Sequence, residues 1–135
     1  MFEEFDEFIS AVSVETHVNF EKIKDGHYEA NVEFEGGRHQ RCTVRLAKDD
    51  VDDPTVEYYS VICEVPQENT QLYKAALILN LSLTYGALSL MGNHLILKQT
   101  TWLQNNDPLR FIKSLTYVAA MADELEEKLT GDDLQ

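Results

Sequence analysis

The sequence predicts a single α+β domain spanning residues 1–135, with its elements in the order α-β-β-β-α-β-β-α. Three observations favour this fold class. Several short stretches alternate between apolar and polar residues, as half-buried strands do. Longer stretches carry apolar residues at helical spacing. Glycine-containing turns join the alternating stretches, as in antiparallel hairpins, and a chain of this length usually forms one domain.

A short amphipathic helix is predicted at the N-terminus. Phe5, Phe8, Ile9 and Val12 recur at helical spacing and share one stripe. The acidic residues around them suit the start of a helix. Residues 14–24 show no clear pattern, so we expect a loop there with at most a short extended piece.

The first hairpin is predicted from the strict alternation of residues 28–34 and 40–46. A three-residue loop, Gly36–Arg38, places Val32 opposite Cys42 and keeps the apolar residues on one face. A two-residue loop places Val32 opposite Arg41 and mixes the faces, so the three-residue loop is expected. This register also pairs opposite charges on the polar face: Glu33 with Arg41, and Glu29 with Arg45.

The third strand is predicted over residues 55–65, where β-branched and aromatic residues are frequent, and Pro66 ends it. The core face is expected to carry Tyr59, Val61, Cys63 and Val65. Tyr58 and Ile62 then lie on the outer face of the sheet.

The second helix is predicted to begin after Asn69 or Thr70 and to end near Gly86. Between Leu72 and Leu83 its only charged residue is Lys74, so it is apolar on almost all sides. One face must cover the sheet, and so small a domain has little left to cover the other. We therefore expect a homodimer with this helix in its interface. The interface residues expected are Leu77, Ile78 and Leu81.

A second hairpin is predicted around the two-residue turn Gly92-Asn93, with Leu88 opposite Leu97 and Leu90 opposite Leu95. The other face of this hairpin carries further apolar residues. Together with those of the third strand they form an expected partner-binding surface: Tyr58, Ile62, Met91 and Ile96. The alternative is that the N-terminal helix covers these side chains.

The third helix has clear end signals, with Asp107 as N-cap, Pro108 at the first helical position and Gly131 as the stop. Arg110 and Lys113 lie near its start and acidic residues near its end, an order that opposes the helix dipole. Its core stripe is predicted to contain Phe111, Leu115, Val118, Ala122, Leu125 and Leu129.

The net charge of −13 argues against binding to nucleic-acid phosphates, which needs clustered Lys and Arg, and against anionic membrane surfaces. No stretch approaches the roughly 20 apolar residues of a membrane span. The first seven residues carry four acids and no base, the reverse of a signal peptide. We therefore expect a cytoplasmic protein.

No catalytic, metal or cofactor site is predicted. The nucleophile elbow, the phosphate-binding loop and the dinucleotide fingerprint are missing, and the four histidines lack ligand spacing. The Asp49–Asp53 loop lacks the spaced oxygens of a calcium loop, so a solvated turn is expected rather than an ion site. Cys42 and Cys63 are expected to be reduced and partly buried. An enzyme built from residues scattered in the sequence stays a third alternative.

The order of elements on a short acidic chain resembles the type III secretion chaperone-like fold, which secretion chaperones share with YbjN-like bacterial proteins. Ala76-Leu77-Ile78-Leu79-Asn80 is similar to the Ala-Leu-x-x-Leu-Asn stretch of their second helix. The resemblance covers the whole chain and implies a bacterial homodimer with a twisted antiparallel sheet and helices packed against it. In the secretion chaperones an unfolded client segment winds over apolar patches and can add a strand to a sheet edge.

Two functions follow as hypotheses. The first is a chaperone-like, non-catalytic module that binds an extended polypeptide as a homodimer. The second is a YbjN-like regulatory or structural homodimer with no extended client. An exposed apolar outer face favours the first, and scattered single apolar residues favour the second.

Overall fold

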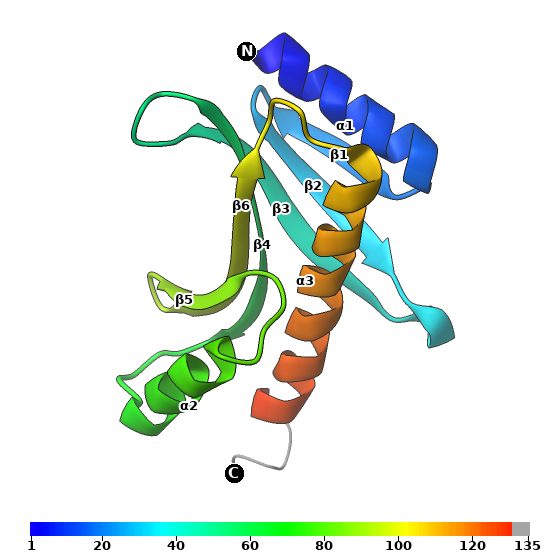
Figure 1. The fold of residues 1–135 in the computed structure, drawn as a ribbon. Helices are drawn as coiled ribbons and strands as arrows, with labels where there is room; N and C mark the ends of the chain where they lie inside the picture. Colours follow the sequence, from blue (N-terminus) through cyan, green and yellow to red (C-terminus); the bar gives the residue numbers. More distant parts are fainter. Residues whose placement is uncertain (131–135) are drawn as a thin grey trace.

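The computed structural model describes residues 1–130, which form three α-helices and one six-stranded antiparallel sheet (Figure 1). The strand order across the sheet is β1-β2-β3-β4-β6-β5. The helices are α1 (Phe2–Thr16), α2 (Thr70–Asn80) and α3 (Pro108–Thr130). The strands are β1 (Asn19–Lys24), β2 (His27–Glu33), β3 (His39–Lys48), β4 (Pro54–Glu64), β5 (Ala87–Met91) and β6 (His94–Trp102). The α+β class is thus as predicted.

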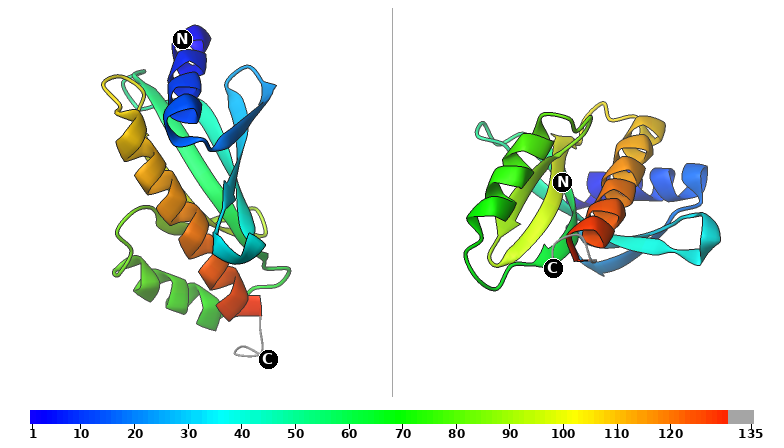
Figure 2. Two further views of the ribbon diagram at one scale, coloured as in Figure 1. Left: turned by 90° about the vertical axis from the view of Figure 1, so that its right-hand side faces the viewer. Right: turned by 90° about the horizontal axis from the view of Figure 1, so that it is seen from below.

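One face of the sheet, called the inner face here, carries the hydrophobic core, and the opposite outer face is open. Buried residues of all three helices join those of the strands in one cluster. Helix α3 lies across the middle of the sheet, α1 packs beside the start of α3, and α2 lies at the β5 end (Figure 2). The rings of Phe8, Phe111 and Tyr58 stack edge to face in turn, which joins α1 to α3 and α3 to β4.

The predicted order of elements lacked strand β1, which lies where we expected a loop. Asn19–Lys24 pairs with β2 at the edge of the sheet, with Phe20 opposite Ala30. Most of its side chains are exposed, so the sequence shows little apolar alternation there. Pairing with β2, not burial, holds this segment extended.

The first hairpin has a three-residue loop, but it lies one position earlier than predicted. Phe34 donates its N–H to the carbonyl of Arg38 at 2.7 Å, so the loop is Glu35–Gly37. Ala30 then faces Cys42 and Val32 faces Gln40, a register two residues away from the predicted one. A shift of two keeps every side chain on its face, so burial cannot separate these registers.

The predicted charge pairs of this hairpin are consequently wrong. Glu29 lies opposite Thr43 and accepts its hydroxyl hydrogen bond at 3.1 Å. Arg45 instead pairs with Glu57 of β4 at 3.4 Å.

From Val56 to Ile62 the two faces of β4 are the reverse of the prediction, whereas Cys63 and Val65 pack against the core as predicted. Val56, Tyr58, Ser60 and Ile62 face the core, while Tyr59 and Val61 face outward. The pairing with β3 decides this, because Tyr58 lies opposite the fully buried Val44. Both faces of this strand carry apolar residues, so the alternation of β4 alone does not identify the buried one.

Helix α2 ends at Asn80 and not near Gly86. Asn69 caps its start, accepting the Leu72 N–H at 3.0 Å, as predicted. Gly86 has a φ of 79°, and a Cβ there would lie 3.0 Å from the Lys98 carbonyl oxygen. This glycine therefore permits close approach of β6 at the start of β5 and does not end the helix.

The second hairpin and α3 match their predictions. Leu88 faces Leu97 and Leu90 faces Leu95 around Gly92-Asn93. Asp107 accepts the Leu109 N–H at 3.4 Å at the start of α3. The α3 stripe is buried from Phe111 to Leu125, with Leu129 packed at its margin. The predicted stop, Gly131, lies outside the described residues.

Candidate interaction surfaces

Large apolar side chains are exposed along α2 and at its C-cap residue, Leu81. Leu77, Ile78 and Leu81 are 71%, 61% and 92% exposed, and we call these three residues the α2 patch. Their spacing of one and four residues places them within one side of the helix. The opposite side of α2 carries Leu72, Ala76 and Leu79, which pack against the core together with Leu83 of the following loop. The three residues predicted to form a dimer interface thus share an uncovered apolar face in the single chain.

Asn80 holds α2 against the end of the sheet. Its side-chain oxygen accepts the Leu88 N–H at 2.7 Å, and its amide N–H donates to the Leu88 carbonyl at 3.5 Å. Leu88 is in β5, the last strand of the sheet, so these backbone groups have no neighbouring strand to pair with. Asn80 therefore occupies part of the free β5 edge and fixes which side of α2 faces outward.

The other edge of the sheet is β1. No strand of the described residues pairs with its outer side, and its side chains are largely exposed. Its regular pairing with β2 breaks between Lys22 and Lys24, where Ile23 is exposed. Bulges and lysines are devices that protect sheet edges, so only the first residues of β1 offer a regular edge.

The outer face of the sheet is polar at its centre. Glu57 lies 3.4 Å from Arg45 and 3.6 Å from Lys98, and Arg45 also covers the Tyr59 ring at 5.7 Å. Glu29 accepts hydrogen bonds from Thr43 and contacts His27 at 3.1 Å. This arrangement is that of a solvent-facing sheet.

The predicted partner-binding surface does not exist as an exposed patch. Tyr58 and Ile62 are 1% and 2% exposed and lie on the inner face. Tyr58 is covered by Phe111 of α3, so neither the open-face prediction nor cover by the N-terminal helix alone is right. Ile96 is on the outer face but only 3% exposed, between Ser89 and Val61. Met91, 37% exposed, is the one member available to a partner.

Neither thiols nor acidic clusters make a reactive site. Cys42 is fully buried, and burial raises the pKa of its thiol to about 12. Cys63 is partly buried, and neither cysteine forms a disulfide. The carboxylate of Asp49 accepts the N–H groups of Val51 and Asp53, and the bond from Asp53 is the main reason why its pKa is lowered. Within residues 1–130 no three His, Cys, Asp or Glu side chains gather as metal ligands would.

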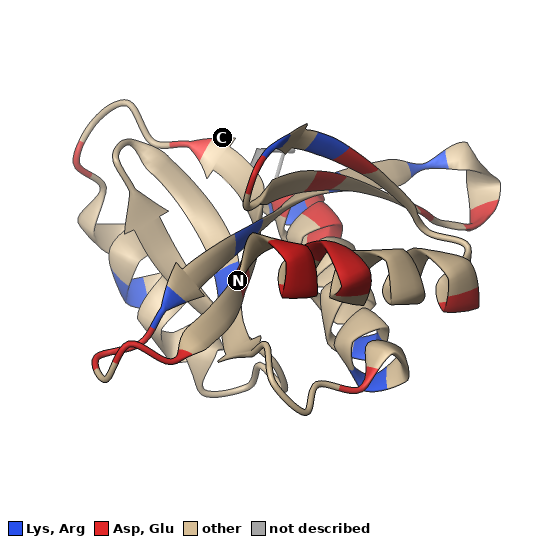
Figure 3. Cartoon of the chain, turned by 90° about the horizontal axis from the view of Figure 1, so that it is seen from above, with Lys and Arg blue, Asp and Glu red and all other residues tan. Residues whose placement is uncertain are grey.

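Acidic residues are spread over several elements (Figure 3). The first turns of α1 and the Asp49–Asp53 loop are acidic, whereas Arg110 and Lys113 give the start of α3 a local positive charge. No helix in the described part of the chain is both long and apolar enough to cross a membrane.

Comparison with known proteins adds no family. No protein-family model matches this chain, and no curated protein is significantly similar to it.

Sequence reasoning found the α2 patch because a helix without polar sides is visible in the sequence. It missed the bonds from Asn80 to Leu88, which fix the orientation of that helix. The available signal was an asparagine where the apolar helical pattern ends, a few residues before a hairpin.

Proposed function

We propose that this protein is a non-catalytic protein-binding module that works as a homodimer through the α2 patch and engages an extended polypeptide at the β1 edge. The observation that carries the proposal is the exposure of Leu77, Ile78 and Leu81 on one side of a helix whose other side is packed.

The energetics of the α2 patch suit a two-fold interface. Each buried Leu or Ile stabilises by about 1.5–3 kcal/mol, so six such side chains from two copies give on the order of 10 kcal/mol. Association costs roughly 4–15 kcal/mol, so the patch alone supports only a marginal dimer. Leu90 and Met91 of β5, which α2 contacts, are also exposed and would add apolar area.

Light scattering tests the dimer. The expected mass is about twice the 15.4 kDa of one chain at micromolar concentration. Leu81→Glu should give the mass of one chain with unchanged secondary structure, because it places two carboxylates in the interface. Leu109→Glu, at a similarly exposed leucine outside α2, is the matched control and should stay dimeric. A wild-type mass of one chain contradicts the proposal.

The β1 edge supports binding of an extended segment by strand addition. In this mode the backbone of the client pairs with a sheet edge and its side chains give specificity. The net charge of −13 favours a client with basic flanks, so binding should weaken as salt rises.

The test of strand addition compares proteins co-purified from a bacterial lysate by wild type, Ile23→Lys and Val14→Lys. Ile23 is the exposed residue at which the regular edge of β1 ends, and Val14 is an exposed valine on α1. A lysine at the edge discourages pairing. Loss of a partner with Ile23→Lys alone supports the proposal, and identical partners for all three proteins contradict it.

A second candidate, a regulatory or structural homodimer with no extended client, is favoured by the ion-paired outer face and the β1 bulge. It predicts the same mass behaviour but no partner that depends on Ile23. For either function we infer a cytoplasmic site of action, which the two free thiols support.

A further inference from the structure

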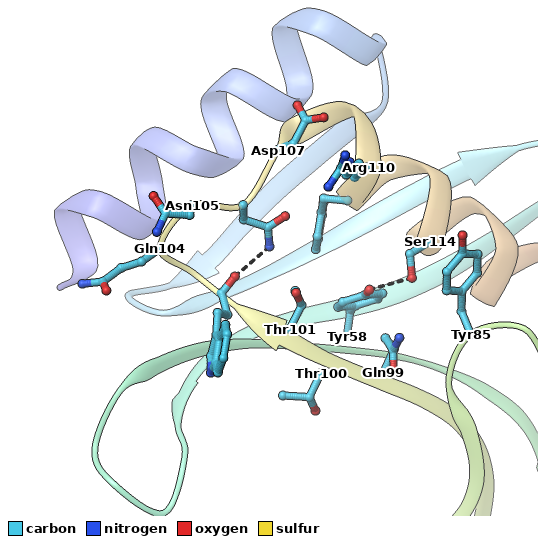
Figure 4. A pocket seen from close by; sticks show the side chains of 13 residues that line it. Tyr58, Tyr85, Gln99, Thr100, Thr101, Gln104, Asn105, Asp107, Arg110 and Ser114 are labelled. Carbon is cyan, nitrogen blue, oxygen red and sulfur yellow. Dashed lines mark hydrogen bonds between the residues drawn. The ribbon is translucent and has the colours of Figure 1, made fainter.

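A cleft opens on the inner face where α3 diverges from β6 (Figure 4). Its volume is about 420 Å³, within the range of small-molecule sites. Tyr58, Gln99 and Thr101 form its floor, Arg110 and Ser114 lie on the α3 side, and Tyr85 of the segment between α2 and β5 also lines it. The cleft shares no residue with the α2 patch.

The floor of the cleft is polar where the fold alone would favour apolar residues. Leu95 and Leu97 of β6 face the core and are buried. Gln99 and Thr101 continue the same face and lie opposite Tyr58 and Val56, two buried inner-face residues. A glutamine and a threonine at these positions keep hydrogen-bonding groups on the inner side of the sheet. The floor of the cleft is therefore polar because the sequence places polar residues on the inner face of β6 at these two positions.

A buried hydroxyl pair lines the cleft and has one hydrogen to donate beyond its mutual bond. Tyr58 Oη and Ser114 Oγ lie 2.7 Å apart, and both residues are over nine-tenths buried. The two hydroxyls carry two hydrogens, and their mutual bond uses one. No other hydrogen bond of either hydroxyl occurs in the described residues. An oxygen atom in the cleft, of water or of a ligand, can accept the second hydrogen.

Arg110 supplies a positive charge beside these donors. None of the ion pairs within residues 1–130 includes it, although the protein is strongly acidic. A cation in the first turn of a helix opposes the helix dipole and costs a few tenths of a kcal/mol. An anion bound beside Arg110 would offset that cost. The lining holds one cation, Arg110, and one carboxylate, Asp107, a balance that disfavours a dianion such as a phosphate ester.

We propose that this cleft binds a small organic carboxylate, with the carboxylate at Arg110 and an uncharged oxygen of the ligand accepting from the Tyr58–Ser114 pair. Gln99 and Thr101 offer further hydrogen bonds to the body of the ligand. This site is independent of the proposed dimer and of any client.

The test is an NMR titration of the isotope-labelled full chain with 4-hydroxybenzoate, benzoate and the neutral analogue benzamide. We expect saturable shifts of the Gln99, Thr101 and Ser114 amides with both carboxylates, strongest with 4-hydroxybenzoate. Benzamide should bind about tenfold more weakly, because it loses the charge-assisted bonds to Arg110.

Two variants separate a built site from general charge attraction. Arg110→Gln should weaken 4-hydroxybenzoate about tenfold, whereas Lys113→Gln, which removes the same charge one turn away outside the cleft, should change it less than about twofold. Both side chains are exposed, so both variants are expected to fold. The proposal is overturned by the absence of saturable shifts with either carboxylate, or by equal losses in the two variants. It is also overturned if only a peptide with a free C-terminal carboxylate binds.

Discussion

Helix α3 lies lengthwise over β3, β4 and β6 and buries its apolar stripe from Phe111 to Leu125. Helix α2 packs mainly on the terminal strand β5. Ala76 is its single buried residue. Both helices are rich in apolar residues, yet one has its stripe inside the chain and the other has three large side chains in water.

The difference follows from position and not from composition. A helix over the middle of the sheet meets inner-face residues from several strands, whereas a helix at the sheet end meets few. Apolar residues that the fold does not bury need another surface, and a contiguous exposed patch commonly marks an interface. The α3 stripe is therefore buried by folding, and the α2 patch is the surface for which we propose association.

Leucine truncation should separate the two helices most strongly. Leu115→Ala on α3 is expected to lower the free energy of unfolding by about 3 kcal/mol, because it removes a fully buried side chain and leaves a cavity. Leu77→Ala on α2 should change the unfolding of the separated chain by less than about 0.5 kcal/mol. Urea unfolding at several protein concentrations measures both. Equal losses extrapolated to low concentration would show that the two helices do not differ.

Removing the bond that orients α2 should have the next largest effect. Asn80→Ala loses both hydrogen bonds to Leu88 and leaves the Leu88 N–H without a partner. The free energy of unfolding should fall by about 1–2 kcal/mol. Hydrogen exchange of α2 and β5 amides should accelerate while that of α3 does not. Asn80→Asp keeps the acceptor for the Leu88 N–H and should lose less. Unchanged exchange in Asn80→Ala would mean that packing alone positions α2.

Removing the hydroxyl of a tyrosine beneath α3 and of one on α2 should give a smaller difference in the free energy of unfolding. Tyr58→Phe removes the buried hydroxyl bonded to Ser114 beneath α3 and should cost about 1 kcal/mol in the free energy of unfolding. Tyr73→Phe on α2 should cost almost nothing, since its hydroxyl makes no hydrogen bond in the described residues. Thermal unfolding of the two variants side by side measures the contrast, and a larger loss for Tyr73→Phe would reverse it.

Charge on the surface of α3 should matter least. Glu124 and Lys128 are 3.1 Å apart one turn from each other, and both are exposed. Glu124→Gln is expected to cost about 0.3–0.5 kcal/mol at low salt, and the loss should disappear in high salt because exposed pairs are screened. A loss above that of Tyr58→Phe would mean that charges, and not the buried stripe, hold α3.

The fold was predictable from sequence where local signals are strong. Asp107 and Pro108 mark the start of α3, and Gly92-Asn93 fixes the register of the second hairpin. Both signals act through neighbours in the sequence, so no long-range information is needed.

Where tertiary pairing decides, local patterns were insufficient. Tyr58 and Ile62 alternate with Tyr59 and Val61, all apolar or aromatic, so only the pairing of β4 with β3 determines which pair is buried. The first hairpin differs by two residues from its prediction because either register keeps Cys42 and Val44 inside. Strand β1 depends on pairing with β2 and carries almost no burial pattern of its own.

The candidate sites divide in the same way. Leu77, Ile78 and Leu81 were identifiable because a helix apolar on every side has an unmatched face. The predicted partner-binding surface of Tyr58, Ile62, Met91 and Ile96 was wrong because the face of β4 that carries Tyr58 and Ile62 is buried. The cleft required the geometry, since Gln99, Arg110 and Ser114 meet only when α3 crosses the sheet.

The two ends of the sheet are not equivalent, and this asymmetry limits growth. A fibre that extends by edge pairing needs a receptive strand at both ends of every subunit. Here the Leu88 backbone groups at the β5 end are already taken by Asn80 of the same chain, while β1 keeps a short regular edge. Pairing of β1 with β1 of another copy would use up the receptive edges of both, so edge pairing by itself joins only two chains. One asparagine thus removes the Leu88 backbone groups from strand pairing and leaves β1 as the more receptive edge.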